Sequence, residues 1–506
     1  MPLIHPENSH EILANENYPI LYAYRQDDEL VMTTEKPKDQ TILFQLPNIT
    51  AESFGDPDFK KDYGLKYALY GGAMANGIAS SDMVIALGKA GFMGSYGAGG
   101  MSLAVISAEI DKIKTVLGDR PYMINMLSNR NADAEMQLAK LLIEKNVPAV
   151  EASAYIVPSD ALLYYRLKGI YRDETGKIIL PRKIIAKISR EEVMEKFVSP
   201  PNAAQVASLV KAGLLTAEEA ALAPYIPVAD DITVEADSGG HTDGRPLVSM
   251  LPALIAFAKR IQKQYSYQKK VRVGAGGGIG TGLSCLGAFQ LGAAYVVTGS
   301  VNQACVEAGT SDYVKKVLSE TAMADVTMAP CADMFESGTK VEVIKKGTMY
   351  PQNAQKLYEY YTKYPSFDSI PPAERERIEK RILKDTFTNI WNGTKEYFAK
   401  VNPAQIDRAE KDPKQKMALV FRWYLGKSSR WAVTGEVSRQ LDMQIWCGQS
   451  MGAFNLWVKG TPFEKRENRK VADVASLLFH SCAYQYMKSM LHMMGADTDE
   501  WKSDVI

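Results

Sequence analysis

The stretch Val271–Ser300, VRVGAGGGIGTGLSCLGAFQLGAAYVVTGS, contains a strand, a turn, a helix and a second strand. A β-branched run stops at the glycines within residues 274–278, a helix is predicted over 282–291, and a second apolar strand is predicted over 293–298. Glycines at a strand end let backbone N–H groups approach an anion, and a helix N-terminus adds a favourable dipole. The pattern predicts the phosphate site that many (β/α)8 barrels build from their last two loops. A glycine-rich packing turn is the alternative.

The length and composition are typical of a globular protein. The 506 residues are 46% hydrophobic and 23% charged, with zero formal net charge, and they are enough for a large barrel and a second domain. Balanced charge argues against nucleic acid or an anionic membrane as a partner, and no apolar run approaches the ~20 residues that span a bilayer. The N-terminus does not resemble a signal peptide, and the five cysteines have no metal spacing. We expect a cytoplasmic protein without a metal site.

Eight short apolar segments alternate with helical patterns between residues 61 and 334, which predicts a (β/α)8 barrel with insertions near 158–182 and 195–230. A doubly wound open sheet is the alternative, but the first strand ends in GGAMANG and not in GxGxxG. The predicted strands are 66–75, 92–96, 122–127, 147–152, 183–188, 231–236 and the two strands of the quoted stretch.

The two ends of the chain have different patterns. Residues 1–60 contain strand-like pieces at 19–24 and 41–46 and predict a small N-terminal cap packed on the barrel. From about residue 334 the apolar residues recur at helical intervals, so residues 335–506 are predicted to form a separate, mainly helical domain.

The motif EADSGGHTDGR (Glu235–Arg245) places His241 after Gly239 and Gly240, at the end of the sixth strand. This is the face of a barrel whose loops carry catalysis, and histidine is the usual proton carrier near neutral pH. A structural histidine is the alternative. Three neighbours are candidates to orient the ring: Asp237, Ser238 and Asp243.

Several segments together resemble a known family. They are AMANG (73–77), INML (124–127), KIIAKIS (183–189), the GGH turn, and the glycine turns that end in TGS. They resemble the nitronate monooxygenase family and, within it, the PfaD-type, trans-acting, FMN-dependent enoyl reductases of polyketide and polyunsaturated fatty acid synthases. The barrel resemblance covers roughly residues 60–320, and the helical tail resembles that of the PfaD type only.

The resemblance implies an FMN site. Ala73, Met74 and Ala75 are expected against the isoalloxazine ring, and Asn125 against the flavin or its phosphate side chain. Lys187 is expected near the pyrimidine end, where a cation stabilises anionic reduced flavin; a lysine that reaches solvent from a strand end is the alternative. The phosphate cradle is implied at Gly239, Gly240, Gly277, Gly278, Thr298, Gly299 and Ser300.

Two features depart from the family pattern. The turn after the seventh strand has an additional glycine, so the phosphate-binding pair within 276–278 is uncertain by one residue. Thr242-Asp243-Gly244 follows His241 where many relatives have a basic residue, so the substrate contacts there can differ.

The implied reaction is a hydride relay from NADPH (or NADH) to FMN and then to the β-carbon of an enoyl thioester on an acyl carrier protein. His241 is the candidate donor of the α-proton, directly or through water. The groups that polarise the thioester carbonyl stay unassigned. A cysteine nucleophile has no supporting motif, so Cys305 and Cys331 are interpreted as packing residues.

The implied partner is the acidic carrier protein, and a homodimer is also considered. The basic residues that could bind the carrier, or could simply be solvated helix surface, are Arg422, Lys427, Arg430, Lys465, Arg466, Arg469 and Lys470. Two other functions stay open: a nitronate monooxygenase that uses O2 on small nitronates, and a flavin-binding scaffold without catalysis.

Overall fold

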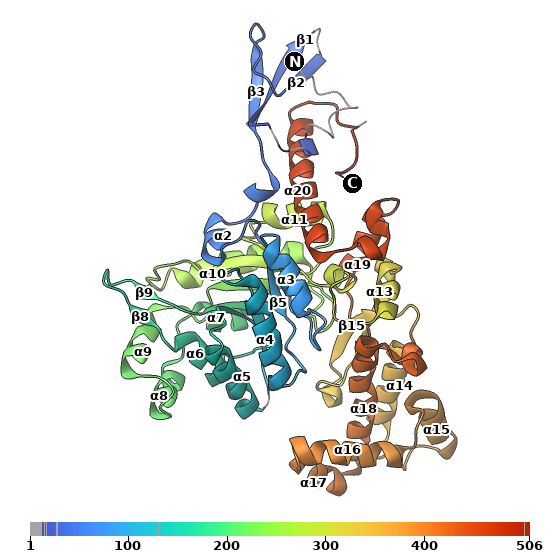
Figure 1. Ribbon diagram of the computed structural model, residues 1–506. Helices are drawn as coiled ribbons and strands as arrows, with labels where there is room; N and C mark the ends of the chain where they lie inside the picture. The colour runs from blue at the N-terminus through green and yellow to red at the C-terminus, as the bar shows by residue number, and fades with distance from the viewer. Residues whose placement is uncertain are drawn as a thin grey trace. The chain divides into compact units, whose positions relative to one another are not determined.

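The computed structural model describes residues 13–14, 16, 18–26, 29–129, 131–499 and 501–505. It divides into two compact units. The segments of each unit can be found in Figure 1 by their colour, which runs with residue number. The barrel unit contains the chain up to residue 236, residues 245–308, and the chain from residue 457. The helical unit contains residues 237–244 and 309–456.

Eight parallel strands close the barrel, as the sequence predicts, and the last strand pairs with the first. Their side chains are almost all buried, which explains why each reads as a short apolar run. The first strand pairs over three residues only, and two residues beyond its end the Ala73 N–H donates a hydrogen bond to the side chain of Glu151. The strands are β4 (Leu69–Gly71), β5 (Met93–Tyr96), β6 (Met123–Leu127), β7 (Ala149–Ser153), β10 (Lys183–Ile188), β11 (Asp231–Glu235), β12 (Arg272–Gly276) and β13 (Val296–Thr298).

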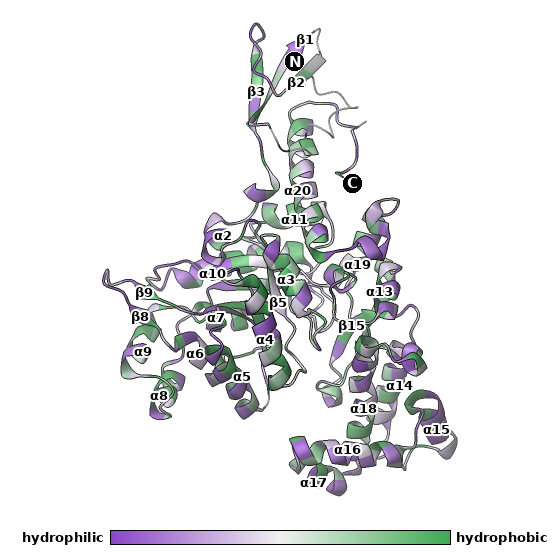
Figure 2. Ribbon diagram, in the orientation of Figure 1, coloured by the Kyte–Doolittle hydropathy of each residue, from purple (hydrophilic) through white to green (hydrophobic). Residues whose placement is uncertain are grey.

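Amphipathic helices surround these strands, and Figure 2 shows that they carry both hydrophobic and hydrophilic residues. The hairpin and the small helices α8 and α9 lie in the long connections before and after β10. The helices are α2 (Pro57–Tyr63), α3 (Ser81–Lys89), α4 (Leu103–Leu117), α5 (Ala132–Glu144), α6 (Asp160–Leu167), α7 (Glu191–Val198), α8 (Ala203–Lys211), α9 (Ala217–Leu222), α10 (Leu247–Gln262), α11 (Gly282–Gln290) and α12 (Ser300–Gln303); the hairpin is β8 (Tyr171–Arg172) with β9 (Ile178–Ile179).

The C-terminal helix α20 (Val471–Met493) also belongs to the barrel unit. Its buried residues pack against α11 and α3, and Gly282 of α11 lies directly on Ser481 of α20. The N-terminal antiparallel sheet, in the order β2-β1-β3, shares a hydrophobic cluster with the far end of α20. Its strands are β1 (Ile20–Gln26), β2 (Glu29–Thr33) and β3 (Ile42–Pro47).

The other elements of the helical unit pack around its long helix α18 (Pro413–Thr434). The buried face of this helix includes Phe421 and Leu425. It also contains a two-stranded antiparallel sheet, β14 (Val326–Pro330) with β15 (Lys340–Ile344). The other elements are α13 (Asp312–Ser319), α14 (Tyr350–Lys363), α15 (Pro372–Arg377), the π-helical segment η5 (Ile378–Leu383), α16 (Phe387–Val401), α17 (Ala404–Lys411) and the 3-10 helix η6 (Val437–Asp442); α19 (Ser450–Trp457) leads back to the barrel unit. No helix in the described part of the chain is both long enough and apolar enough to cross a membrane.

This division differs from the expected boundary at residue 334. Residues 457–506 were expected in the helical domain but belong to the barrel unit, because the apolar face of α20 packs on α11 and α3. Residues 309–334 join the helical unit because β14 pairs with β15. Residues 237–244 also belong to the helical unit, although they come directly after a barrel strand.

The close approach of α11 and α20 gives a test of the packing. In Gly282→Ala, the new Cβ would lie 1.8 Å from Ser481 Oγ, so we expect the free energy of unfolding to fall by about 1–3 kcal/mol. Gly287→Ala in the same helix is the control, because its Cβ would meet nothing within 4 Å and alanine favours the helix. Chemical denaturation of both variants measures the difference, and equal stability of the two would contradict this packing.

Candidate functional site

The carboxyl ends of the barrel strands bring most of the predicted site residues to one rim. Ala73–Ala75 follow β4, Asn125 lies on β6, and Lys187 lies near the end of β10. The glycine turns follow β12 and β13 at the same end. Parallel strands of a closed barrel all end at one rim, which is where barrel enzymes carry their chemistry.

Lys187 is held between two carboxylates. Its Nζ lies 2.6 Å from Glu235 Oε1 and 4.0 Å from Glu151 Oε1, and its side chain is only 19% exposed. Burial lowers the pKa of Lys187, but the charges of Glu235 and Glu151 outweigh burial, so the pKa is raised and the ammonium stays charged. Lys187 is therefore a fixed cation, not a lysine that reaches into solvent.

Glu151 was not predicted as a site residue. It is fully buried on β7, and its Oε2 accepts a hydrogen bond of 2.8 Å from the Ala73 N–H. Burial raises its pKa, an effect that the Lys187 ammonium only partly offsets. The one signal in the sequence was a glutamate inside the apolar run 147–152.

Asn125 supports the barrel wall. Its Nδ2 donates to the Glu151 carbonyl at 3.0 Å and to Ser153 Oγ at 3.1 Å, and the residue is buried. The backbone at Met74 packs closely against Gly97. A Cβ at Gly97 would lie 1.7 Å from the Met74 carbonyl oxygen, so this contact leaves no room for a side chain. Contact of either residue with a flavin stays a prediction.

The two glycine turns leave open space beside the backbone. Gly277 and Gly278 have φ values of 90° and 76°, and a Cβ at Gly278 or Gly299 would meet nothing within 4 Å. Gly276 differs, because it lies in β12 and its Cβ would be 3.1 Å from Thr233. The open space in this turn is therefore at Gly278, and which glycines bind a phosphate stays a prediction. The Thr298 hydroxyl accepts a hydrogen bond of 2.9 Å from Asn302, and Ser300 begins α12.

The His241 loop belongs to the helical unit. Gly240 exchanges two backbone hydrogen bonds with Glu342 of β15, at 2.9 and 2.7 Å. Gly240 has a φ of 85°, and a Cβ at Gly239 would lie 2.8 Å from the backbone of Cys447 and Gly448. Gly239 is thus required by close packing and Gly240 by its positive φ, and the Gly240 N–H is already donated to the Glu342 carbonyl oxygen. Contact of Gly239 or Gly240 with a phosphate stays a prediction.

The ring of His241 is half-exposed and contacts the connection between β14 and β15. Its Nε2 lies 3.5 Å from Asp333 Oδ2 and 3.8 Å from Cys331 Sγ. Because both groups approach the same nitrogen, they do not form a nucleophile–base–acid relay. Burial raises the pKa of Cys331 to about 12, which keeps it a thiol and agrees with its interpretation as a packing residue. Asp237, which was expected beside the ring, accepts a hydrogen bond from Gln449 instead.

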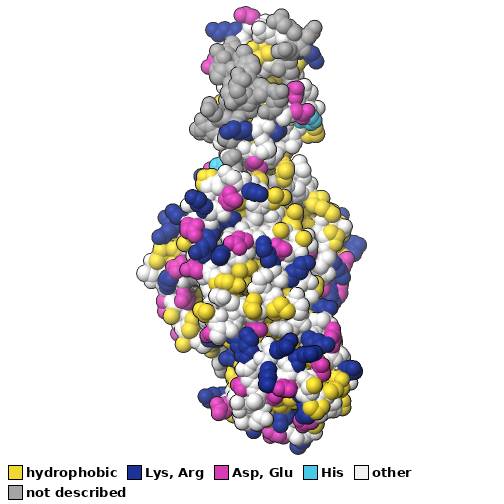
Figure 3. All heavy atoms as spheres, turned by 90° about the vertical axis from the view of Figure 1, so that its right-hand side faces the viewer, with side chains coloured by type: hydrophobic (Ala, Val, Ile, Leu, Met, Phe, Trp, Pro, Cys, Tyr) yellow, Lys and Arg dark blue, Asp and Glu magenta, His cyan; other side chains and the backbone are white. Residues whose placement is uncertain are grey.

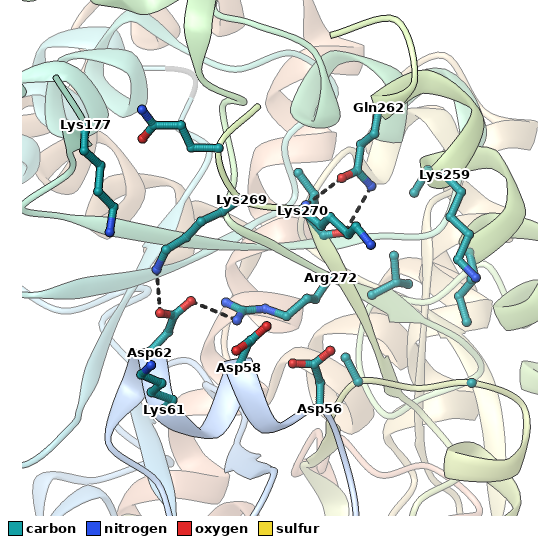
Figure 4. Close-up of a pocket in the computed structure, with 17 residues that line it drawn as sticks. Asp56, Asp58, Lys61, Asp62, Lys177, Lys259, Gln262, Lys269, Lys270 and Arg272 are labelled. Carbon is teal, nitrogen blue, oxygen red and sulfur yellow. Dashed lines mark hydrogen bonds and ion pairs between the residues drawn. The ribbon is translucent and has the colours of Figure 1, made fainter. Parts of the chain in front are cut away.

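A cavity of about 720 Å³ lies at the other end of the barrel strands (Figure 4). Asp62 contacts both Lys269 and Arg272 in its wall, and Arg272 also pairs with the buried Asp231. None of the predicted site residues lines this cavity. It is therefore separate from the rim that carries Lys187 and the glycine turns.

Comparisons with known proteins agree with this arrangement. The family model for nitronate monooxygenase matches residues 59–363, and the model for the inserted helical domain of [acyl-carrier-protein] S-malonyltransferase matches residues 364–443. The polyketide biosynthesis protein PksE of Bacillus subtilis is 41% identical over 97% of this chain and 64% of its own. A polyunsaturated fatty acid synthase polypeptide of Thraustochytrium sp. is 46% identical over 81% of this chain and 28% of its own. The chain thus spans less than two thirds of these curated relatives.

Among solved structures, the enoyl reductase domain of MlnA from the macrolactin cluster of Bacillus amyloliquefaciens is 38% identical, with a TM-score of 0.84 over 87% of this chain and 99% of that chain. FabK of Thermotoga maritima, at 17% identity and a TM-score of 0.51, shares the fold. The family resemblance seen in the sequence is confirmed: the chain belongs to the nitronate monooxygenase family and, within it, to the group that includes the enoyl reductase domain of MlnA.

Proposed function

We propose that this chain is an FMN-dependent enoyl reductase that reduces the α,β-double bond of enoyl thioesters carried by an acyl carrier protein in polyketide or polyunsaturated fatty acid biosynthesis. The main support is the similarity to the MlnA enoyl reductase domain over almost the whole of that domain. Two relatives, PksE and the Thraustochytrium synthase polypeptide, are named for polyketide and polyunsaturated fatty acid synthesis. The nucleotide is NADPH or NADH.

Several features of the barrel rim support the proposed FMN site. The backbone has open space at Gly278 and at Gly299, where a phosphate could approach the turns 277–278 and 299–300, and Thr298 precedes the second turn. Ala73–Ala75 and Asn125 would face the ring system, and Lys187 would supply a fixed positive charge. Bound FMN would supply hydride transfer between the nicotinamide and the enoyl carbon.

The chain's own groups supply charge and protons. Glu235 holds the Lys187 ammonium in place, so the cation costs no reorganisation during the reaction. The half-exposed imidazole of His241 can deliver a proton to the α-carbon of the substrate and recover one from water. Asp333 stabilises the ring when it carries a positive charge.

The carrier protein is proposed as the partner because residues 364–443 resemble a helical domain of an enzyme named for acyl carrier protein. The basic residues expected to bind it do not form one set. Arg469 is buried and donates to backbone carbonyl groups, and Arg422 pairs with Glu336. Lys427 and Arg430 are exposed on α18 of the helical unit, whereas the run 465–470 belongs to the barrel unit. On the face shown in Figure 3, basic, acidic and hydrophobic side chains are interspersed.

Anaerobic stopped-flow absorbance of the purified holoenzyme tests the activity. After reduction with NADPH, we expect rapid reoxidation by a crotonyl thioester on a carrier protein, and we expect His241→Ala to slow it by about 10²–10⁴-fold. The control is His492→Ala, because His492 is an exposed histidine of the C-terminal helix. Reoxidation by O2 alone, with direct flavin reduction by a nitronate, would establish a nitronate monooxygenase. A protein that binds no flavin would rule out both enzymes.

The phosphate site can be tested separately from turnover. Gly299→Ala would place a methyl group in open space, so we expect the flavin-free protein to keep nearly its full stability. The same methyl group would obstruct the approach of an anion, and the dissociation constant of FMN should rise by at least about tenfold. Fluorescence titration with FMN measures the affinity, and Gly287→Ala is the matched control. Unchanged FMN affinity would place the phosphate elsewhere.

A further inference from the structure

Glu342 occupies the central position of the small sheet that holds the His241 loop. Its strand β15 pairs with β14 on one edge. On the other edge, Glu342 exchanges both backbone hydrogen bonds with Gly240, and the Cys447 N–H also approaches its carbonyl oxygen at 3.4 Å. Gly240 directly precedes His241 in the chain. The backbone of Glu342 therefore fixes the position of the main chain from which the His241 side chain extends.

The side chain of Glu342 is enclosed by the same loop. The residue is 5% exposed, and within the described structure neither its Oε2 nor the buried Ser238 Oγ has a hydrogen-bond partner. A Cβ at Gly448 would lie 3.3 Å from that Oε2. Gly239 of the loop therefore packs directly against Gly448, beside the Glu342 carboxyl group. A side chain larger than that of glycine would not fit at either position without a shift of the neighbouring atoms.

The charges around Glu342 favour its neutral form. Burial raises the pKa of Glu342 to about 7, and the negative charge of Asp237 on the loop adds to this shift. The other titratable group that faces it is the Cys447 thiol, whose pKa burial raises strongly. Neither neighbour offers a positive charge that would stabilise a buried carboxylate.

We propose that Glu342 is a positioning residue for His241: its backbone pairs the loop of residues 237–241 with β15, its neutral carboxyl group lets the loop close over it, and ionisation of that group weakens the closure. The role of His241 as proton donor rests on the proposed function, whereas the hold on the loop does not. When protonated, Glu342 is neutral and does not repel the Asp237 carboxylate on the loop. When ionised, it faces the Asp237 carboxylate without compensation.

The pH window follows from the direction of the shift. An unfolded glutamate has a pKa of about 4.3, below that of Glu342 in the folded chain. The folded state therefore binds more protons between these two values, and the stabilising contribution of the neutral side chain is lost as pH rises towards 7. Positioning of the loop should weaken over the upper part of the same window.

Glu342→Gln tests the inference, because glutamine keeps the shape and the neutral state at every pH. Glu359→Gln, at an exposed glutamate of α14, is the matched control. In infrared difference spectra at about pH 6, the wild-type protein should show a protonated carboxyl band that Glu342→Gln lacks and Glu359→Gln keeps. Absence of that band would show that Glu342 is ionised and would overturn the proposal.

The link to His241 needs a second measurement that requires no turnover. Nuclear magnetic resonance of the histidine rings, with His241 assigned by His241→Asn, should give the same His241 signal in the wild type and in Glu342→Gln at about pH 6. At about pH 8 the wild-type signal should depart from that of Glu342→Gln, while Glu359→Gln follows the wild type at both pH values. Coincident signals in all three proteins at about pH 8 would overturn the positioning role.

The kinetic consequence separates this inference from the proposed function. In the holoenzyme, the ratio of kcat/KM in Glu342→Gln to kcat/KM in the wild type, for the carrier-bound enoyl substrate, should rise severalfold from about pH 6 to about pH 8, because titrations that both proteins share cancel in this ratio. Glu342→Ala should lose activity throughout this range. If the protein does not reduce enoyl substrates, the proposed function fails, and the infrared and magnetic resonance measurements still decide the positioning role.

Discussion

Two backbone hydrogen bonds between Gly240 and Glu342 fix the loop that carries the candidate proton donor. They attach this loop to the small sheet of the helical unit, although it follows directly after a barrel strand. The requirement for glycine at 239 and 240, the enclosure of Glu342, and the contacts of His241 with Cys331 and Asp333 all depend on that pairing. A motif that reads as a catalytic loop is thus also a strand-pairing site.

The residues that the proposed function uses belong to both units. The barrel unit supplies the permanent charge of Lys187 and the open glycine turns, both on a rigid frame of short, buried strands. The helical unit supplies the half-exposed imidazole, held by short-range contacts within one sheet and its connecting loop. The fixed charge of Lys187 and the candidate proton donor His241 therefore have separate structural supports, each specified by its own set of packing contacts.

The sequence predicted the features that depend on local pattern. The eight barrel strands could be recognised because a strand buried on both faces is a short apolar run, and β10 was placed at its observed bounds. The roles of Glu151 and Glu342 were not recognised, because each depends on a partner far along the chain: Ala73 and Lys187 for Glu151, and Gly240 for Glu342. The pairing of Gly240 with Glu342 was not recognised for the same reason, since a glycine looks alike in the sequence whether an anion or another strand requires it. The assignment of α20 failed because helical periodicity shows that a face is buried but not against which element.

The return of α20 to the barrel unit means that the chain passes between the two units four times, after residues 236, 244, 308 and 456. No single cut therefore separates one unit from the other. A fragment that ends at residue 334 keeps β14 without β15 and leaves α11 without α20. A fragment that omits residues 309–456 keeps the His241 loop but removes the strand that orders it. Recombination with related enzymes would have to exchange the loop 237–244 together with the segment 309–456, because these two pieces form one structural module encoded in two places.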